Sequence, residues 1–137
     1  MSQVLVDANV LLDVLTEDPH WFDWSGKALE EQAAKARLCI NPLIYAEVSV
    51  GFERIEELDE ALPASDFTRL PLPWEAGFLA GKAFLRYRRD GGQRRSPLPD
   101  FIIGAHAAVS GLPLITRDVR RYRTYFPKLL LICPGQA

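Results

Sequence analysis

Four carboxylates lie at positions from which they can act together: Asp7, Glu47, Asp100 and Asp118. Asp7 and Asp118 each follow a short apolar, strand-like run and precede a helical one. Asp100 opens an apolar helical stretch, and Glu47 lies on a helical stretch with few polar neighbours. In an open α/β sheet, ligands bind in the crevice outside the carboxyl ends of the strands. We therefore predict that these acids meet at that edge of a sheet.

Helix capping is the simpler explanation for the three aspartates when each is taken alone. An aspartate at a helix N-terminus stabilises the helix by about 1 kcal/mol. Glu47 does not fit that explanation, because an acid is almost never fully buried unless it is paired. No Lys or Arg lies three or four residues from Glu47. It therefore needs a partner from elsewhere, and a cation is the natural one.

Carboxylates that meet in this way repel one another and take up protons unless a cation neutralises them. Mg²⁺ and Mn²⁺ prefer carboxylate and water oxygens, and the lack of accompanying His or Cys argues against zinc. One or two ions held by acids alone suit phosphate ester hydrolysis, because such ions activate water and stabilise charge on the reacting oxygens. The sequence has no glycine-rich P-loop, so nucleoside triphosphate binding has no support.

Polar residues beside these acids are candidates for orienting them. Asn9 and Thr116 would donate hydrogen bonds to the carboxylates, although ordinary turn and strand-end chemistry explains such residues equally well. Asp13 lies about a turn and a half beyond Asp7 on the same helical stretch, and we expect it to face solvent.

Short strand-like runs alternate with longer helical patterns along the chain. Strands are predicted at 3–6, 38–41, 68–72, 114–116 and 129–132, the third at a sheet edge because its prolines remove ladder donors. Helices are predicted at 8–16, 21–37, 43–54, 74–90, 100–110 and 119–126, with residues 55–62 a further helix or a continuation. The alternation predicts a single α/β domain over residues 1–137, with a parallel, helix-covered sheet.

The helix predicted at 74–90 carries its large apolar side chains on one stripe, which we expect to face the core. This stripe consists of Trp74, Gly77, Phe78, Gly81, Phe84 and Leu85. Its glycines would let another backbone approach closely. Trp21, Phe22 and Trp24 are likewise expected in the core. His106 is expected there too, because it lies about 600° of helical rotation beyond Asp100 and so does not share a helix face with that acid.

Composition places the chain among ordinary globular proteins, with 137 residues of which 48% are hydrophobic. No run approaches the ~18 apolar residues of a membrane helix, and the N-terminus lacks the basic region of a signal peptide. We therefore expect a cytoplasmic protein. Cys39 and Cys133 sit in apolar runs and are expected to be buried thiols rather than disulfide partners or zinc ligands.

Charge is divided unevenly along the chain. Residues 1–68 carry 14 acids and 4 bases, whereas residues 69–137 carry 4 acids and 12 bases. This division suggests that part of the C-terminal half faces a polyanion, although solvated helix faces explain it too. The basic residues form two groups, Arg86, Arg88, Arg89, Arg94 and Arg95, and Arg117, Arg120, Arg121, Arg123 and Lys128.

Arginine suits phosphate recognition because its guanidinium is a planar fork. We expect Arg86, Arg89, Arg94, Arg95, Arg117, Arg120 and Arg121 to bind the backbone of a polyanion, which a family resemblance in the sequence implies to be RNA. The glycine-rich loop at 91–97 is expected to be flexible enough to close on that ligand.

Four segments together resemble one known family. "LVDANVLLDVL", "NPLIYAEV", "LPDFIIGAHA" and "LPLITRD" followed by "YF" match, in order, the signature of PIN-domain proteins, and of VapC-type toxins in particular. The match spans nearly the whole chain. The resemblance implies a three-layer α/β/α fold with a central parallel sheet of about four or five strands.

The same resemblance implies an activity and partners. It implies an endoribonuclease that depends on Mg²⁺ or Mn²⁺, cuts a structured RNA such as transfer or ribosomal RNA, and is the toxin of a toxin–antitoxin pair. The family's catalytic and metal-binding acids fall on Asp7, Glu47, Asp100 and Asp118, and its accessory polar positions on Asn9 and Thr116. Toxins of this kind form homodimers and pair with a small antitoxin whose C-terminal segment blocks the site.

Two other functions remain open at this point. One is a phosphohydrolase with Asp7 as covalent nucleophile, although that mechanism usually has a second acid where this chain has Asn9. The other is a non-catalytic module that binds RNA or protein, in which the acids only cap helices.

Overall fold

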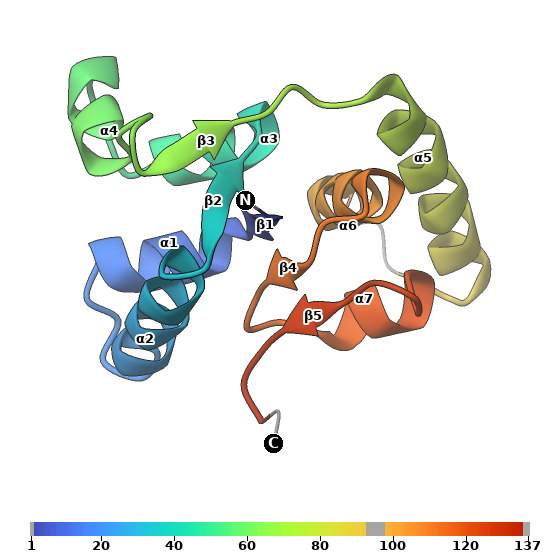
Figure 1. Ribbon diagram of the computed structural model, residues 1–137. Coiled ribbons are helices and arrows are strands. Elements are labelled where there is room, and N and C mark those ends of the chain that lie inside the picture. Colours follow the sequence, from blue (N-terminus) through green and yellow to red (C-terminus); the bar gives the residue numbers. More distant parts are fainter. Residues whose placement is uncertain (1, 93–97, 136–137) are drawn as a thin grey trace.

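A five-stranded parallel sheet with strand order β3-β2-β1-β4-β5 forms the centre of the structure. The structure is a computed structural model that describes residues 2–92 and 98–135 (Figure 1). The strands are β1 (Ser2–Val6), β2 (Ala36–Ile40), β3 (Phe67–Arg69), β4 (Leu114–Ile115) and β5 (Leu131–Ile132). The predicted parallel sheet of four or five strands is confirmed.

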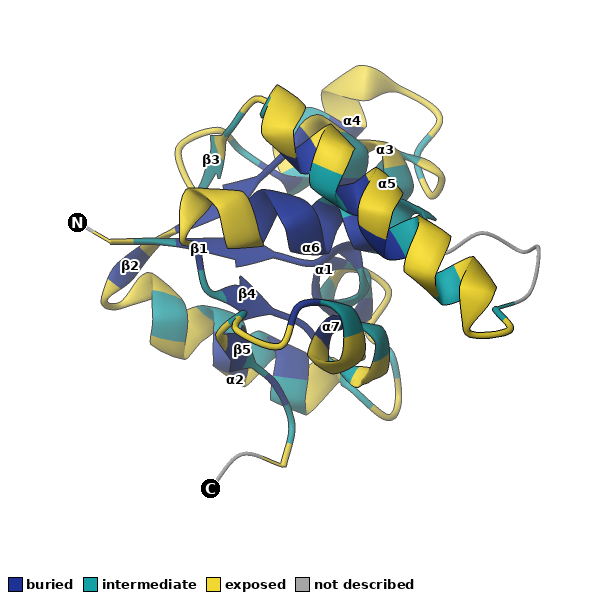
Figure 2. Cartoon of the chain, turned by 90° about the vertical axis from the view of Figure 1, so that its right-hand side faces the viewer, coloured by how far each residue is buried: buried dark blue, intermediate teal, exposed yellow. Residues whose placement is uncertain are grey.

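Helices cover both faces of this sheet. They are α1 (Ala8–Leu15), α2 (Phe22–Ala33), α3 (Pro42–Ser49), α4 (Ile55–Ala61), α5 (Trp74–Arg89), α6 (Leu98–Ser110) and α7 (Arg120–Tyr125). Figures 1 and 2 show α1 and α2 on one side of the sheet and α5 and α6 on the other. The result is the three-layer α/β/α fold expected from the sequence. No described helix has the length and apolar character needed to cross a membrane.

The strand order creates a switch point beside β1. The chain leaves β1 for β2 and β3 on one side, then returns to place β4 and β5 on the other. Leu5 pairs with Leu114 and Val6 with Ile115 at this junction, and the Asp7 amide donates to the Ile115 carbonyl at 2.9 Å. In such sheets, ligands bind at the carboxyl edge where the order reverses. The residues that follow β1 and β4 are therefore the first candidates for a ligand-binding site.

The core lies around β1 and α6, whose buried residues are dark blue in Figure 2. Leu5 and Val6 have no measurable solvent exposure. The apolar helix predicted at 100–110 is buried as expected over 101–107, although its last turn is exposed. It ends before Gly111, whose φ of +65° is a conformation that glycine adopts easily. Cys39 and Cys133 are both buried free thiols, as predicted.

Several element boundaries differ from the predicted ones. The helix predicted at 21–37 ends at Ala33, so that β2 begins at Ala36. The helix predicted at 43–54 ends at Ser49, and residues 55–61 form the separate helix α4. The chain turns between them, where the Gly51 amide bonds the Val48 carbonyl at 3.2 Å, because glycine is a poor helix residue. The edge strand β3 is present, although it ends before the prolines.

Helix α5 buries a different stripe from the predicted one, although Phe84 of the predicted stripe is half-buried and its ring centre lies 6.2 Å from that of Phe101. Its buried residues are Ala76, Ala80 and Ala83, whereas Trp74 is 92% exposed and Phe78 71%. Small side chains let α5 pack closely along α6, and that close packing outweighs the burial of the bulkier stripe. The two predicted inward glycines have no neighbour within 4 Å of an added Cβ in the described chain.

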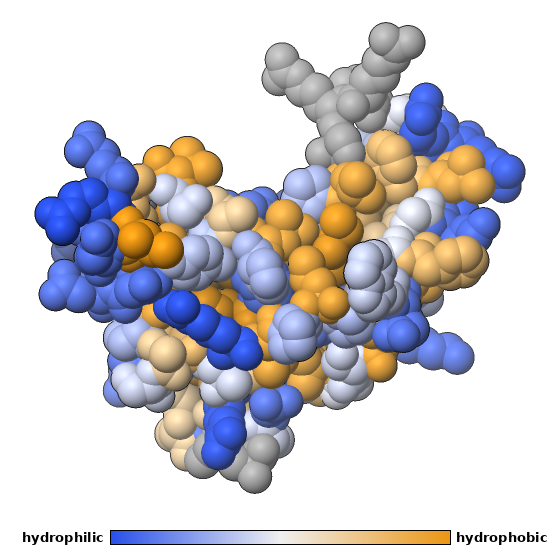
Figure 3. Space-filling model, turned by 90° about the horizontal axis from the view of Figure 1, so that it is seen from above, coloured by the Kyte–Doolittle hydropathy of each residue, from blue (hydrophilic) through white to orange (hydrophobic). Residues whose placement is uncertain are grey.

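The aromatic residues of α2 are also less buried than predicted. Phe22 is 38% exposed, and Trp21 and Trp24 are half-buried. Ser25 and Ala28 are the residues of α2 that are fully buried. Figure 3 shows that apolar side chains reach the surface in the middle of the face seen from above, with hydrophilic side chains at both ends.

Candidate functional site

A hollow of about 660 Å³ opens at the carboxyl edge of the sheet. We call it the acidic cavity, and its lining consists of Asp7, Ala8, Asn9, Leu12, Glu47, Val50, Gly51, Asp100, Arg117 and Asp118. The four predicted acids come from four places: the end of β1, helix α3, the first turn of α6, and the loop after β4. The structure therefore brings together side chains that are distant in sequence.

Asp7 lies at the floor of the cavity and is only 4% exposed. Its Oδ2 accepts hydrogen bonds of 2.9 Å from the Thr116 hydroxyl and 2.9 Å from the Tyr122 phenol, and one of 3.5 Å from the Asn9 amide. The Asn9 amide also donates to Thr116 Oγ1 at 3.2 Å. Asp7 precedes α1, but its side chain makes no capping hydrogen bond to that helix. Its contacts thus differ from those of a simple helix cap.

The surroundings of Asp7 oppose its negative charge. Burial raises its pKa from 3.8 to about 6, and the nearby Asp100 adds to that rise. The hydrogen bonds from Thr116 and Tyr122 act in the opposite direction. Removing a carboxylate from water disfavours its charged form, whereas donors to it favour that form. The donors therefore hold the Asp7 carboxylate in place, but they lower its pKa by less than burial raises it.

Glu47 has a buried carboxylate oxygen that no hydrogen-bond donor of the described chain satisfies. It projects from α3, and its Oε1 is buried without a hydrogen-bond partner among residues 2–92 and 98–135. Burial raises its pKa from 4.5 to about 7, with further contributions from the charges of Asp7 and Asp100. A buried polar atom without a partner is uncommon and calls for a specific explanation.

Asp100 and Asp118 complete the acidic wall. Asp100 Oδ2 pairs with Arg121 Nη1 at 3.0 Å, and its pKa is raised chiefly by burial, while Arg121 opposes the rise and Asp118 adds to it. Asp118 is exposed, and its amide donates to Thr116 Oγ1 at 3.2 Å. Val119, not Asp118, is the residue that caps α7, and it does so without a side-chain bond.

The donor set of the cavity matches a hard divalent cation in chemistry. Its side-chain ligands are oxygens, and two of them, Glu47 Oε1 and Asn9 Oδ1, are buried and have no partner in the described chain. Over the same residues, however, no three acid, histidine or cysteine side chains converge closely enough to enclose an ion as they now lie. The residues therefore fit such an ion in ligand type and charge, and binding would require their side chains to draw together.

Sequence reasoning was wrong about Asp13, which does not face solvent. It is 2% exposed, and its Oδ2 accepts hydrogen bonds of 2.7 Å from Ser25 Oγ and 2.7 Å from Arg117 Nε. The available signal was its position three residues after Val10, on the stripe that α1 buries. Its partners come from α2 and from the loop after β4, and no local pattern identifies them.

Tyr122 is the contact of Asp7 that the sequence analysis missed. It lies within the helix predicted at 119–126, where it is 2% exposed and donates its phenol hydroxyl to Asp7. Burial and the neighbouring acids raise its pKa well above 10. A buried tyrosine hydroxyl needs a hydrogen-bond partner, so a tyrosine on the inner face of a short helix was the available signal.

The predicted RNA-binding arginines are spread over several locations. Arg117 lines the acidic cavity, and Arg121 pairs with Asp100 at its side. Arg86, Arg89 and Arg120 are exposed. Arg94 and Arg95, and with them most of the loop predicted at 91–97, lie outside the described residues.

Aromatic rings accompany some of these arginines. The guanidinium of Arg86 lies 5.4 Å from the Tyr125 ring centre, and that of Arg121 lies 5.8 Å from the Tyr87 ring centre. Cation–π contacts of this length hold guanidinium groups over ring faces. The guanidinium groups of Arg86 and Arg121 are therefore partly held in place by aromatic rings of the same chain.

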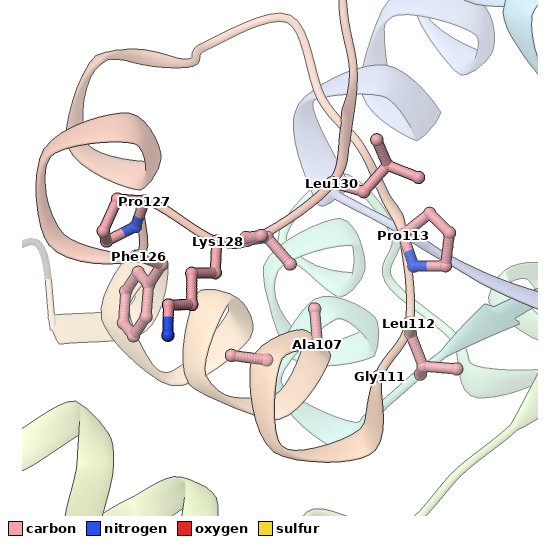
Figure 4. A pocket seen from close by; sticks show the side chains of 10 residues that line it. Ala107, Gly111, Leu112, Pro113, Phe126, Pro127, Lys128 and Leu130 are labelled. Carbon is pink, nitrogen blue, oxygen red and sulfur yellow. The ribbon is translucent and has the colours of Figure 1, made fainter.

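Neither His106 nor a second hollow of the structure belongs to the acidic cavity. His106 is 1% exposed, and its Nδ1 is 2.9 Å from the Asn41 side-chain amide, so it is a satisfied core residue, as predicted. Figure 4 shows a separate hollow of about 350 Å³ between the end of α6 and the loop before β5. Its lining is apolar apart from Lys128, and it contains no acid.

Comparison with known proteins identifies the family. Residues 4–127 match the family model of the PIN domain. The chain belongs to the PIN domain family. We found no match among curated protein sequences. The PIN-domain resemblance seen in the sequence is thus confirmed over most of the chain.

This PIN domain is also similar to solved structures over almost its whole length. VapBC2 from Rickettsia felis, bound to a DNA fragment from its promoter, has 18% identity, a TM-score of 0.72, and coverage of 96% of this chain and 98% of that one. A toxin–antitoxin complex from Klebsiella pneumoniae has 23% identity, a TM-score of 0.71, and coverage of 98% and 99%. FitAcB from Neisseria gonorrhoeae has 17% identity, a TM-score of 0.73, and coverage of 98% and 99%. At these identities the likeness establishes the shared fold.

Proposed function

We propose that this PIN domain is a VapC-type toxin, an endoribonuclease that depends on Mg²⁺ or Mn²⁺. The observation that carries the proposal is the buried, unpartnered Oε1 of Glu47 in a cavity lined by three further acids. An unpaired acid in such company is costly unless a cation binds there. The four ligands would be Asp7, Glu47, Asp100 and Asp118. A divalent cation held by them supplies activated water and neutralises charge on the attacked phosphate.

The chain's own residues would prepare this site. Thr116 and Tyr122 hold Oδ2 of Asp7 and so orient the carboxylate. Asn9 supports Thr116 from the adjoining turn of α1. Fixed neighbours of this kind keep a metal ligand in its working orientation. The exposed Arg86, Arg89 and Arg120, and the half-buried Arg121 that pairs with Asp100, would hold the RNA backbone.

The solved relatives suggest the biological setting. The Klebsiella pneumoniae structure is described as a toxin–antitoxin complex, and the Rickettsia felis structure as VapBC2 bound to a DNA fragment from its promoter. We propose by analogy that this chain pairs with a small antitoxin, that the antitoxin blocks the acidic cavity, and that the toxin forms a homodimer. Light scattering of the purified toxin would then give about twice the chain mass of 15.4 kDa. A mass equal to one chain would contradict the dimer.

The test of the activity is cleavage of bulk RNA by the purified chain, with EDTA, Mg²⁺ or Mn²⁺. Asp7→Asn and Glu47→Gln should each lower the rate at least about 100-fold, because each removes a charged group that holds the cation. Glu56→Gln is the matched control, since the Glu56 side chain is 68% exposed and lies in α4. It should retain the full rate.

Two results would contradict the proposal. Cleavage that is unchanged in EDTA would rule out the dependence on a cation, and full activity of Glu47→Gln would remove Glu47 from the site. Release of phosphate from a small phosphomonoester, without cleavage of RNA, would instead favour a phosphohydrolase that uses Asp7. Binding of RNA without any cleavage would favour a non-catalytic module.

A further inference from the structure

Arg117 is fixed in position by a buried acid. Its Nε lies 2.7 Å from Asp13 Oδ2, and the same oxygen accepts a 2.7 Å hydrogen bond from Ser25. The Asp13 side chain is 3% exposed and that of Arg117 is 30% exposed. The guanidinium also lies 5.4 Å from the Trp21 ring centre. Asp13 of α1 and Trp21 before α2 therefore hold this side chain, and Ser25 of α2 fixes Asp13 in turn.

The same residue, Arg117, also lines the acidic cavity. Among the residues that the structure describes, Arg117 is the one basic residue in the cavity lining. Its Nε is engaged by Asp13, whereas neither Nη1 nor Nη2 donates a hydrogen bond to any residue within the described ranges. The two free nitrogens of a guanidinium form a planar pair that matches two oxygens of one phosphate.

We propose that Arg117 is the phosphate-binding group of the acidic cavity and that Asp13 is its positioning residue. This inference rests on the proposed function, because it assigns the place where the RNA backbone enters the site. A wall of carboxylates repels a phosphate, and a fixed positive charge in the cavity lining reduces that repulsion and attracts the phosphodiester. Holding that charge in advance lowers the entropy lost when RNA binds.

The arginines of α7 are held differently. Arg121 uses Nη1 to bind Asp100, and Arg120 is exposed. Neither lines the cavity. Arg117 should therefore contribute to phosphate binding at the cavity, and the arginines of α7 to the RNA surface around it.

A purely structural salt bridge is the competing explanation. In that case Asp13 and Arg117 would only join α1 to the loop after β4, and breaking the pair would lower stability without a specific effect on RNA. The two explanations differ in the affinity for RNA when both residues are changed, which a double-mutant cycle measures.

The experiment measures binding of unfractionated transfer RNA to the full chain in EDTA, by fluorescence anisotropy over a salt series. Arg117→Ala should weaken binding about tenfold and lower the salt slope by about one. Arg117→Lys should recover only part of that loss, because it keeps the charge and lacks the fork. Arg54→Ala, which removes a 68% exposed arginine that does not line the acidic cavity, is the control and should change affinity less than twofold.

The role of Asp13 is tested in two backgrounds. Asp13→Asn should weaken RNA binding about threefold to fivefold in the wild-type chain and leave the affinity of the Arg117→Ala chain unchanged. Thermal melts of all variants show which of them fold, and Arg117→Lys keeps the test decisive if Arg117→Ala unfolds. Asp13→Asn that weakens binding equally in both backgrounds would overturn the positioning role.

The failures of the two proposals are distinguishable. If Glu47→Gln abolishes cation-dependent cleavage while Arg117→Ala and Arg117→Lys bind RNA like the Arg54→Ala control, the inference about Arg117 is wrong and the nuclease stands. If the wild-type chain neither binds nor cleaves RNA, both proposals are wrong.

Discussion

The phenol of Tyr122 donates a hydrogen bond of 2.9 Å to Oδ2 of Asp7. The two residues are 115 positions apart, so the contact ties α7 to the end of the first strand. Thr116 reaches the same oxygen at 2.9 Å. Two hydroxyl donors on one buried carboxylate oxygen favour its charged form. They partly offset the burial that raises the pKa of Asp7.

Tyr122→Phe removes one of those donors without changing the shape of the core. The pKa of Asp7 should rise further, and the free energy of unfolding at pH 7.5 should fall by about 1–2 kcal/mol, because a hydrogen bond to a buried charge is lost. At pH 5 the loss should be smaller, since Asp7 is then largely protonated. Urea denaturation at the two pH values measures both.

Tyr125→Phe is the matched control for that change. The Tyr125 phenol also donates to a carboxylate at 2.9 Å, but its partner Asp90 is exposed. Exposed polar pairs contribute little to stability, so its unfolding free energy should change by less than about 0.5 kcal/mol. Equal losses for both variants would show that burial of Asp7 is not the cause.

The pH dependence of stability follows from Asp7 and Glu47. Their pKa values are raised to about 6 and about 7 in the folded chain. The folded state therefore binds protons more tightly than the unfolded state, so the stability of the cation-free protein falls as pH rises from about 4 to about 7. Asp7 accounts for roughly 3 kcal/mol of this loss of stability at most.

A bound cation should reverse that loss, because it stabilises the charged carboxylates. Thermal melts in EDTA and in Mn²⁺ should differ by several degrees at pH 7.5 and by little at pH 5. In Glu47→Gln the EDTA melting temperature at pH 7.5 should rise and the response to Mn²⁺ should shrink. A cation-induced shift of the same size at both pH values would contradict this account of the acidic cavity.

Substitutions of Asn41 should change the stability of the fold without changing the acidic cavity. Its Oδ1 accepts the Ile44 amide at 2.9 Å to cap α3, and its amide lies 2.9 Å from His106 Nδ1. Asn41→Ala should lower the free energy of unfolding by about 2–3 kcal/mol, through the lost cap and a buried ring nitrogen without a partner. Asn41→Ser keeps the cap oxygen and should lose about half as much.

Binding of Mn²⁺ by these two variants is the second measurement. The affinity measured by calorimetry should stay within about twofold of the wild-type value, because neither bond of Asn41 involves a residue that lines the acidic cavity. A large loss of Mn²⁺ affinity in folded Asn41→Ser would show that the cap and the cavity are coupled.

The orientation of α5 predicts opposite effects on its two faces. Ala80→Leu should lower the free energy of unfolding by about 1–3 kcal/mol, because Ala80 is 1% exposed and a larger side chain in a packed core forces its neighbours to shift. Trp74→Ser should change it by less than about 0.5 kcal/mol, since Trp74 is 92% exposed. Chemical denaturation of the two variants checks this, and the reverse order would mean that the aromatic stripe is the buried one.

The sequence alone was sufficient to predict the order of strands and helices and the edge at which the acids meet. Strand ends, helix starts and the turn at Gly111 are local features, because the alternation of apolar residues and the backbone preference of glycine act within a few residues. Asp7 and Asp118 follow parallel strands, so the side of the sheet on which they lie follows from the topology. These are properties that neighbouring residues determine.

Tertiary structure decided which side chains pack against which. Arg117 finds Asp13 across 104 positions and Tyr122 finds Asp7 across 115, and no local pattern encodes pairings at that distance. The face that α5 buries depends on how closely α6 can approach, so small alanines were buried in place of larger aromatic rings. Burial of a polar or apolar group is settled by the whole packed core, because each buried side chain must find its partners among all the elements that surround it.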